Sequence, residues 1–335
     1  MTSTIAALPF FGGEFSTFDP LDAGTFEITT AGTFDATFAR CAMFVDRFSG
    51  GFTSPKWADA GTFWYRLQAW NSLATALTGE AIVRFSNNAG TVVAELWATP
   101  VGGSGVQVAF SVKTLQSGVL TTVGSSVTVG SNLLQTLDIK FVAGGGGSVT
   151  FYTSGTFRWT ATGLDHSGWA GIGQYLSKSN LTSDEEFYYS QMIGKTTSTI
   201  GNFVYTDRLD TESGAPNNAW AGGVTDINEI VYNDSTFIST NTPNDVSTFY
   251  DSTLNLTGYS ILGRGVASRT RVQDAGPTGC QLVLESGGTN YFSATITLAV
   301  AFEALFNSWT VNPNGSVVWT PTTAAASKGG VKAIA

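Results

Sequence analysis

The chain of 335 residues carries a formal net charge of −9, and only 12% of its residues are charged. The length predicts two domains, because a single hydrophobic core rarely grows beyond about 250–300 residues. The acidic excess extends over both halves, so no basic face is expected for nucleic acid or for an anionic membrane. The content of 39 glycines and 13% aromatic residues favours β-sheets joined by tight turns.

Residues 1–25 are rich in aromatic side chains and glycine and show no clear period, and we expect them to form an N-terminal arm. Phe10, Phe11 and Phe15 are too apolar to remain in water, so the arm either packs on the body of the chain or fills a contact with another subunit. The arm lacks the basic and apolar regions of a signal peptide, and no run of about 20 apolar residues follows it. We therefore expect synthesis in a cytoplasm and no membrane insertion.

Short predicted strands follow one another through residues 26–194, the second predicted segment. Strict alternation of side chains over residues 62–71 indicates one of these strands. A turn at residues 86–90 indicates a hairpin, and four glycines at 144–147 mark another reversal. Residues 184–194 alternate after three acids and are predicted to be the closing strand. Many short strands with Gly-rich turns are typical of a sandwich or jelly roll.

Three tryptophans near one another in this segment are candidates for contacts with a sugar, because exposed tryptophans stack on sugar rings. Trp57 lies in a polar loop together with Asp59 and is the best exposed candidate. Trp64 and Trp70 share one side of a predicted strand, and packing in a core is the alternative for both. The sequence therefore predicts a glycan site formed by Trp57, Asp59, Trp64 and Trp70.

The pattern of reactive residues argues against catalysis. His166 is flanked by Asp165 and Ser167, but neighbours on an extended chain point apart, and no Gly-x-Ser-x-Gly motif surrounds a serine. The acids at 184–186 are adjacent rather than alternating along a strand, which indicates a solvated turn and not the acid pair of a glycosidase. We expect an ordinary loop histidine, no catalytic residue and no enzyme.

The cysteine content argues against both a metal site and a disulfide. Cys41 and Cys280 lie in different predicted domains, and we expect two buried thiols. One histidine and two distant cysteines cannot supply the four ligands of a zinc site. No cofactor is predicted from these residues.

Residues 195–335, the third predicted segment, begin with a region rich in Asn, Asp, Thr and Ser. Its acidic side chains include Asp207, Asp210, Glu212, Asp226 and Glu229, and no spacing among them resembles an EF-hand loop.

Arginines are concentrated on one long predicted strand, residues 259–274, with residues 280–285 as its expected hairpin partner. Arg269 and Arg271 fall on the same side, and Arg264 lies nearby. In so acidic a chain we expect these arginines to pair with carboxylates of this or a neighbouring subunit. Residues 327–335 are expected to form a short tail.

The first of these domains resembles the concanavalin A-like jelly roll of the laminin-G-like type. The resemblance lies in an aromatic strand, a long strand before a Gly turn, the strand after that turn, a Trp-Ala-Gly-Ile-Gly segment and an aromatic closing strand: residues 63–70, 137–142, 148–152, 169–173 and 187–193. It implies an all-β protein in which a jelly-roll sandwich is followed by a smaller β-sandwich domain. Laminin-G-like folds sometimes bind calcium through Asp and backbone carbonyls, so the resemblance also makes calcium an alternative to no metal. Its candidate ligands in this chain are Asp207, Asp210 and Glu212, or Asp226 and Glu229.

The second domain resembles the carboxy-terminal region of tailed-bacteriophage virion proteins that join a laminin-G-like jelly roll to a small β-module. The matching pieces are an acidic block, an Arg-x-Arg strand, a Leu-Glu-Ser-Gly-Gly-Thr turn and an ending with Trp-Thr-Pro and Gly-Gly-Val-Lys: residues 202–232, 269–274, 284–289, 319–321 and 329–332. The Ala- and Thr-rich residues 322–327 depart from the pattern.

This resemblance implies a structural protein of the phage tail, baseplate or fibre, located in the virion and acting by assembly. Other virion proteins and further copies in a homo-oligomer would be its partners, and a host cell-surface glycan would be a further ligand. The alternatives are a carbohydrate-binding adhesin and a capsid-attached fibre or decoration protein.

Overall fold

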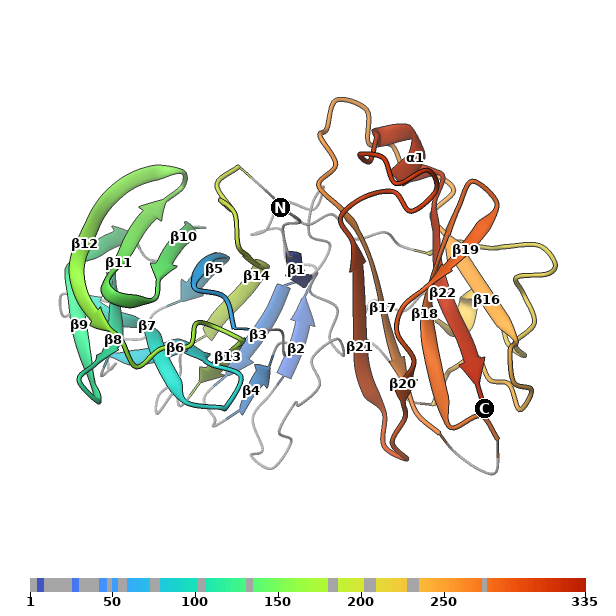
Figure 1. Ribbon diagram of the computed structural model, residues 1–335, viewed down its shortest axis with the longest axis horizontal. Coiled ribbons are helices and arrows are strands. Elements are labelled where there is room, and N and C mark those ends of the chain that lie inside the picture. Colours follow the sequence, from blue (N-terminus) through green and yellow to red (C-terminus); the bar gives the residue numbers. More distant parts are fainter. Residues whose placement is uncertain are drawn as a thin grey trace. The chain divides into compact units, whose positions relative to one another are not determined.

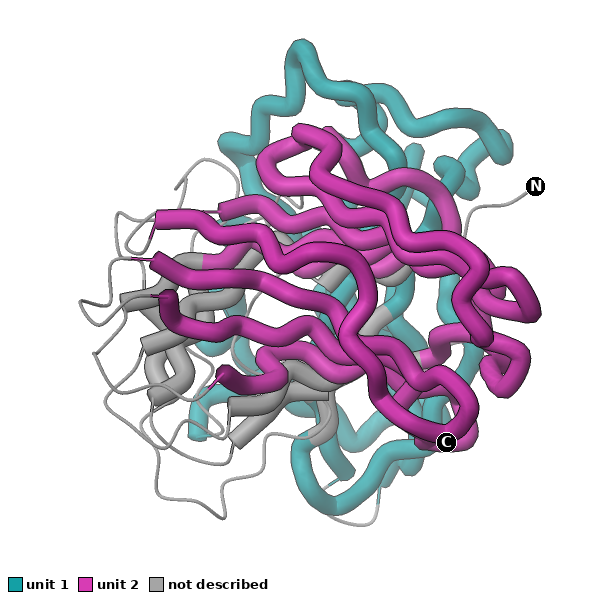
Figure 2. The backbone as a smooth tube through the Cα atoms, turned by 90° about the vertical axis from the view of Figure 1, so that its left-hand side faces the viewer, with its two compact units in different colours: residues 1–5, 11–16, 206–335 teal, residues 6–10, 17–205 magenta. Residues whose placement is uncertain are grey.

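The computed structural model describes most of the chain and forms two compact units (Figure 1). The described residues are 5–8, 26–29, 42–46, 50–53, 59–72, 79–101, 107–130, 135–179, 186–201, 209–227, 235–272 and 276–335. One unit comprises residues 6–10 and 17–205, and the other comprises residues 1–5, 11–16 and 206–335, as coloured in Figure 2. Nearly all described elements are strands, which confirms the predicted all-β class.

The first unit contains two antiparallel sheets. The larger has eight strands in the order β12-β11-β10-β5-β14-β3-β2, with β1 paired to β14. Its strands are β1 Ile5–Leu8, β2 Phe26–Thr29, β3 Ala42–Asp46, β5 Thr62–Ser72, β10 Gln135–Val142, β11 Gly144–Thr153, β12 Thr156–His166 and β14 Glu186–Lys195. The smaller has six strands in the order β4-β13-β6-β7-β8-β9. These are β4 Gly50–Thr53, β6 Glu80–Ser86, β7 Val92–Val101, β8 Gln107–Gln116, β9 Val119–Gly130 and β13 Gln174–Ser179.

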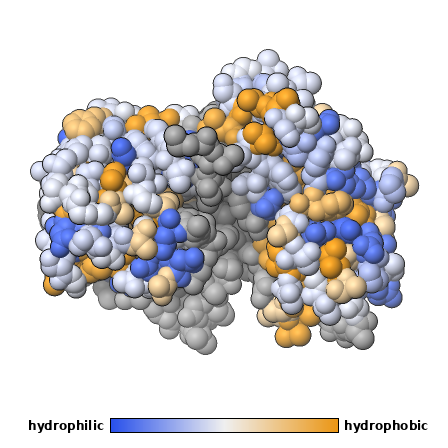
Figure 3. All heavy atoms as spheres, in the orientation of Figure 1, coloured by the Kyte–Doolittle hydropathy of each residue, from blue (hydrophilic) through white to orange (hydrophobic). Residues whose placement is uncertain are grey.

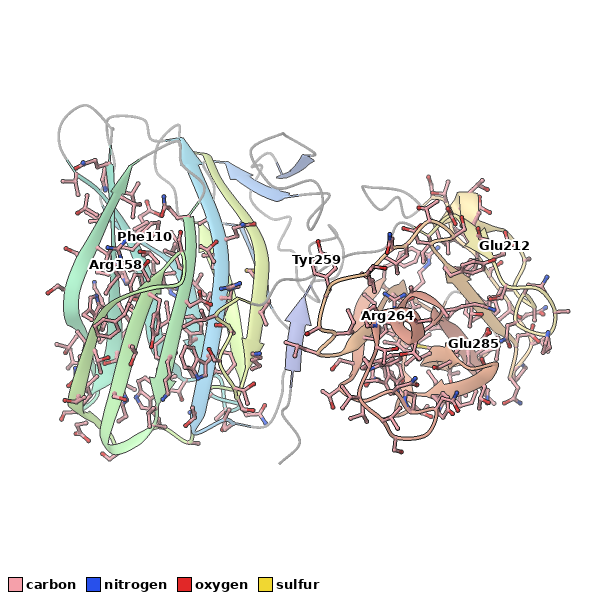
Figure 4. The ribbon with its side chains drawn as sticks, turned by 90° about the horizontal axis from the view of Figure 1, so that it is seen from above. Phe110, Arg158, Glu212, Tyr259, Arg264 and Glu285 are labelled. Carbon is pink, nitrogen blue, oxygen red and sulfur yellow. The ribbon has the colours of Figure 1, made fainter. Side chains whose placement is uncertain are left out.

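The core of this unit lies between the two sheets and follows from the alternation of side chains. Phe63, Tyr65 and Leu67 of β5 are buried on one side of the strand, as predicted. Phe85 of the smaller sheet packs against them, with its ring centroid 4.9 Å from that of Tyr65. Phe110, labelled in Figure 4, is also buried here. A sandwich of two layers is the result, as the sequence predicted.

The four glycines at 144–147 begin β11 with an irregular register opposite the end of β12. Gly144 and Gly146 have φ angles of 97° and 82°, which favour glycine. A Cβ atom on Gly147 would lie 2.4 Å from Nδ1 of His166. The glycine run therefore allows both a reversal and a close approach to the histidine ring.

The second unit contains a six-stranded sheet in the order β15-β16-β22-β18-β19, with β20 paired to β18, and a two-stranded sheet, β17-β21. A short helix, α1 Pro321–Ala325, and a 3-10 turn, Val224–Asp226, complete the described elements. The strands are β15 Thr211–Glu212, β16 Val246–Tyr250, β17 Arg264–Thr270, β18 Gly279–Ser286, β19 Thr289–Phe292, β20 Ile296–Thr297, β21 Glu303–Trp309 and β22 Lys328–Ile334.

Two predictions for this unit are wrong. The expected tail forms β22, which pairs with both β16 and β18. The sequence did not indicate this strand, because it contains two glycines and glycine is rare in strands. Gly330 is needed here, since a Cβ atom at this position would clash with the backbone of Ser247. The strand β17 pairs with β21 and not with β18, its expected hairpin partner.

A buried carboxylate joins three strands of the larger sheet in this unit. Glu285 of β18, labelled in Figure 4, forms an ion pair of 2.7 Å with Lys328 of β22. It also accepts hydrogen bonds from Asn217, at 2.9 Å, and from Thr248 of β16, at 3.1 Å. The contacts satisfy the carboxylate, so it serves the structure of this unit.

Among the described residues, no helix is long and apolar enough to cross a membrane.

Candidate functional site

The outer face of the eight-stranded sheet gathers charged and aromatic side chains from neighbouring strands. The antiparallel register sets Arg66 of β5 opposite Asp138 of β10, and Trp64 opposite Lys140. Tyr152 of β11 stands opposite Asp138 on the other side of β10. Because side chains alternate, all five project away from the core that Phe63 and Tyr65 fill.

A buried ion pair lies at the centre of this face. Nε and Nη2 of Arg66 each donate a hydrogen bond of 2.8 Å to the Asp138 carboxylate. The Thr199 hydroxyl, from the segment after β14, donates a third bond of 2.6 Å to Oδ1 of Asp138. All three residues are buried, although they lie on the outer side of the sheet. The carboxylate is therefore fully engaged by its neighbours.

Lys195, the last residue of β14, is buried beside this ion pair. Its backbone pairs with Trp64. Burial lowers the pKa of the Lys195 ammonium, the charge of Arg66 lowers it further, and the charge of Asp138 opposes both effects. Two cationic side chains, Arg66 and Lys195, thus lie beside the Asp138 carboxylate.

Three aromatic side chains form a continuous row across the same face, here called the aromatic row: Trp64, Tyr152 and Phe157. The rings of Trp64 and Tyr152 stack with centroids 5.8 Å apart and an interplanar angle of 26°. Phe157 of β12 meets Tyr152 edge to face at 5.8 Å, and its side chain is 57% exposed. Lys140 Nζ lies 5.7 Å from the centroid of the Trp64 ring.

Hydroxyl groups border the aromatic row. The Thr160 hydroxyl of β12 donates a hydrogen bond of 3.1 Å to the Thr150 hydroxyl of β11. Arg158, labelled in Figure 4, is exposed on the same strand and donates a hydrogen bond to the hydroxyl of Thr153, which stands opposite the core residue Leu137 and so lies on the other side of the sheet. An apolar row bordered by hydroxyls and by the Lys140 ammonium suits a ligand that has both apolar faces and polar edges.

The outer face of the six-stranded sheet carries similar residue types that bond to one another. Glu95 of β7 accepts a hydrogen bond of 2.9 Å from Arg84 and one of 2.7 Å from the Trp97 indole. Lys113 Nζ lies 3.2 Å from the centroid of the Trp97 ring. This cluster joins three strands and serves as a comparison for the aromatic row.

The four predicted glycan residues differ in their placement. Trp64 lies in the aromatic row and is partly exposed. Asp59 accepts a hydrogen bond of 2.7 Å from the Asn88 amide and so holds a turn of the smaller sheet. Trp57 and the side chain of Trp70 lie outside the described residues.

Sequence reasoning missed Tyr152, Phe157, Lys140 and Lys195. The alternation of Lys140 with the buried Ile139 and Phe141 was the one available signal. The partnership of Trp64 with Tyr152 depends on β10 lying between β5 and β11, which no local pattern reveals.

His166 lies at the end of β12 and is buried, so the prediction of an ordinary loop position is wrong. Its ring stacks on Trp169 at 3.9 Å, and Nδ1 donates to the Val142 carbonyl at 2.8 Å. Burial lowers the pKa of His166 and outweighs the opposing effects of Val142 and Asp165. The Ser167 hydroxyl donates a hydrogen bond of 2.5 Å to Asp165, so these neighbours form no triad with the histidine.

The acids Asp184 and Glu185 lie outside the described residues, as does the side chain of Glu186.

The predicted calcium ligands hold backbone turns where they are described. Ser252 donates to both carboxylate oxygens of Asp210, at 2.9 and 2.8 Å. Glu212 accepts from the Val224 amide at 2.7 Å, and Asp226 accepts from the Gly223 amide at 2.9 Å. Within the described part of the chain, no group of three or more His, Cys, Asp and Glu side chains could hold a metal ion. Asp207 and Glu229 lie outside it.

The predicted interface arginines contact other groups in the same unit. Arg264 Nε donates to the Ser327 hydroxyl at 3.0 Å. The Arg271 guanidinium lies 4.5 Å from the centroid of the Phe302 ring. The side chain of Arg269 lies outside the described residues, as do Phe10, Phe11 and Phe15.

Of the two cysteines, the described one, Cys280, is free and buried as predicted, and Cys41 lies outside the described residues.

Comparisons with known proteins identify a fold and no family. No protein-family model matches the sequence, and no curated protein sequence matches it. The endo-beta-1,4-glucuronan lyase of the fungus Trichoderma reesei is similar at 9% identity and a TM-score of 0.43, over 56% of this chain and 95% of that one. The calreticulin globular domain of T. cruzi has 8% identity and a TM-score of 0.39, over 56% and 88% of the two chains. The alginate lyase Aly36B has 13% identity and a TM-score of 0.37, over 50% and 86%.

These similarities concern the β-sandwich alone and give no ligand for this chain. They do correct one prediction, namely that the chain is not an enzyme. Glucuronan and alginate lyases are among the similar structures, so the lack of an acid pair does not exclude enzymatic activity. They give no support to an origin in a phage virion.

Proposed function

We propose that the outer face of β5, β10, β11 and β12 binds a carbohydrate chain. The observation that supports this proposal is the aromatic row, in which Trp64, Tyr152 and Phe157 line up across the strands with Phe157 largely exposed. Sugar rings have apolar faces and hydroxylated edges, and this face offers aromatic rings beside hydroxyls and cations.

The arrangement of the row argues for binding rather than for core packing. The core of this unit lies on the opposite side of β5, where Phe63 and Tyr65 are fully buried. Residues that only fill a core would lie on that side. An exposed apolar surface on a polar sheet face indicates a contact with a ligand.

A glycan array tests the proposal with the intact chain and two variants. We expect the intact chain to bind a subset of glycans and the double variant Trp64→Ala/Tyr152→Ala to lose that binding. Trp97→Ala, which removes a tryptophan from the other outer face, is the matched control and should retain it. Binding that survives in the double variant would remove this face as the site. Circular dichroism of each variant checks its folding.

Assembly through subunit contacts, as a tailed-phage structural protein would require, is a second candidate function, and an exposed apolar patch in the second unit favours such contacts. Val311, Val317 and Val318 are 43%, 53% and 75% exposed. An antiparallel bridge between Asn312 and Val317 brings the two chain segments that carry these valines together. Figure 3 shows one face of the molecule, on which apolar and polar residues are mixed over the described surface. A second copy of the chain would bury these valines.

Light scattering tests this second candidate. We expect a homo-oligomer for the intact chain and dissociation for Val317→Asp/Val318→Asp. A monomer at every concentration would contradict it.

A further inference from the structure

The charges on the proposed carbohydrate-binding face differ in sign from those of the whole chain. The formal net charge of the chain is −9. Among the described side chains of this face and of the adjoining end of β14, Arg66, Lys140 and Lys195 contribute three positive charges against the one negative charge of Asp138, which leaves a formal +2. A local positive region in an acidic protein indicates a purpose other than general solubility.

The Asp138 carboxylate does not neutralise the two lysines. Both oxygens of Asp138 accept hydrogen bonds from Arg66, and Thr199 donates to one of them. Within the described part of the chain, neither Lys140 nor Lys195 forms an ion pair with a carboxylate. The Lys140 ammonium instead makes a cation–π contact with the ring of Trp64, a member of the aromatic row.

The position of Lys195 adds to this excess of positive charge. It is buried, with only 6% of its surface exposed, and lies beside Arg66. A buried ammonium next to a guanidinium is costly, and an anion nearby would offset that cost. A neutral sugar could not do so.

We propose, resting on the carbohydrate-binding function above, that the ligand is an acidic polysaccharide whose carboxylates lie beside Lys140 and whose sugar rings stack along the aromatic row. Lys140 supplies the direct contact because it is partly exposed and borders the row. Arg66 and Lys195 supply a positive field from below the surface, which strengthens as the ligand excludes water.

The test compares acidic glycans with their own neutral derivatives. Each uronate-containing polysaccharide that binds on the array is reduced at its carboxyl groups to the neutral sugar, and both forms are titrated against the full chain by calorimetry. We expect binding of the acidic form, a weaker affinity at higher salt, and loss of binding after carboxyl reduction. Equal affinity for the reduced form would overturn the inference and leave the carbohydrate-binding function standing. No binding to any glycan would overturn both.

Variants locate the contact. Lys140→Gln should weaken binding of the acidic form about fivefold, as expected for one partly exposed ion pair. Lys113→Gln removes one positive charge from the opposite outer face and should leave affinity unchanged. Equal losses in both variants, or equal binding of a single-stranded oligonucleotide of matched charge, would show attraction to charge alone and overturn the inference.

Discussion

Arg66 and Asp138 form a bidentate ion pair on the outer side of a sheet whose core lies on the other side. The pair is buried because the segment after β14 returns over it and places Thr199 on the carboxylate. It therefore joins β5, β10 and the chain that leaves the sandwich. The aromatic row begins at Trp64, the next residue on the same face of β5.

Removal of Asp138 should strongly destabilise the first unit. Asp138→Ala leaves the buried Arg66 charge without its partner, and we expect a loss of about 3–5 kcal/mol in the free energy of unfolding. Denaturant titration followed by tryptophan fluorescence measures this loss. Asp59→Ala removes a carboxylate that holds only a turn and should cost less than about 1 kcal/mol. The double variant Arg66→Met/Asp138→Leu should regain much of the stability, and a double variant as unstable as Asp138→Ala would contradict this view of the pair.

Loss of the Trp64 ring should weaken glycan binding more than it weakens the fold. Trp64→Ala removes the centre of the aromatic row, and we expect about a tenfold weaker affinity, equivalent to about 1.4 kcal/mol. Titration calorimetry with the array-selected glycan measures the change. Trp97→Ala on the other outer face should bind with unchanged affinity, and a similar loss in both variants would remove the distinction between the two faces.

His166 should titrate below the usual histidine range. Burial lowers the pKa of His166 in the folded state, whereas in the unfolded chain its pKa should be about 6.5. Between the folded and the unfolded pKa, the folded state therefore binds fewer protons than the unfolded state. Stability is fully present above the unfolded pKa and is lost as the pH falls toward the folded pKa. His166 is the single histidine of the chain, so its ring protons give an assigned titration curve by nuclear magnetic resonance. A folded pKa at or above that of the urea-unfolded chain would contradict the burial.

Cys280 should be unreactive while the second unit is folded. Burial raises the pKa of its thiol to about 11, so the reactive thiolate is scarce at neutral pH. In a Cys41→Ser background, a disulfide reagent should label the chain only after denaturant is added. Rapid labelling of the native chain at neutral pH would show that the thiol is exposed.

Local patterns predicted much of the fold but only one member of the aromatic row. The alternation around Phe63 and Tyr65 indicates a sandwich strand, and it also places Trp64 on the opposite side. Neither Tyr152 nor Phe157 could be assigned to Trp64, because strand order is a long-range property. In the second unit, β22 was missed because Gly329 and Gly330 weaken the strand signal. Close packing against the backbone of Ser247 requires Gly330, and close packing is visible only in the folded chain.

The central claim is that a glycan covers the aromatic row, and oxidative footprinting tests it within one molecule. Hydroxyl radicals oxidise exposed aromatic side chains, and mass spectrometry measures the rate at each residue with and without the array-selected glycan. We expect the glycan to slow oxidation of Trp64, Tyr152 and Phe157 and to leave Trp97 on the opposite face unchanged. Unchanged oxidation of the aromatic row under saturating glycan, or equal protection of Trp97, would contradict the claim.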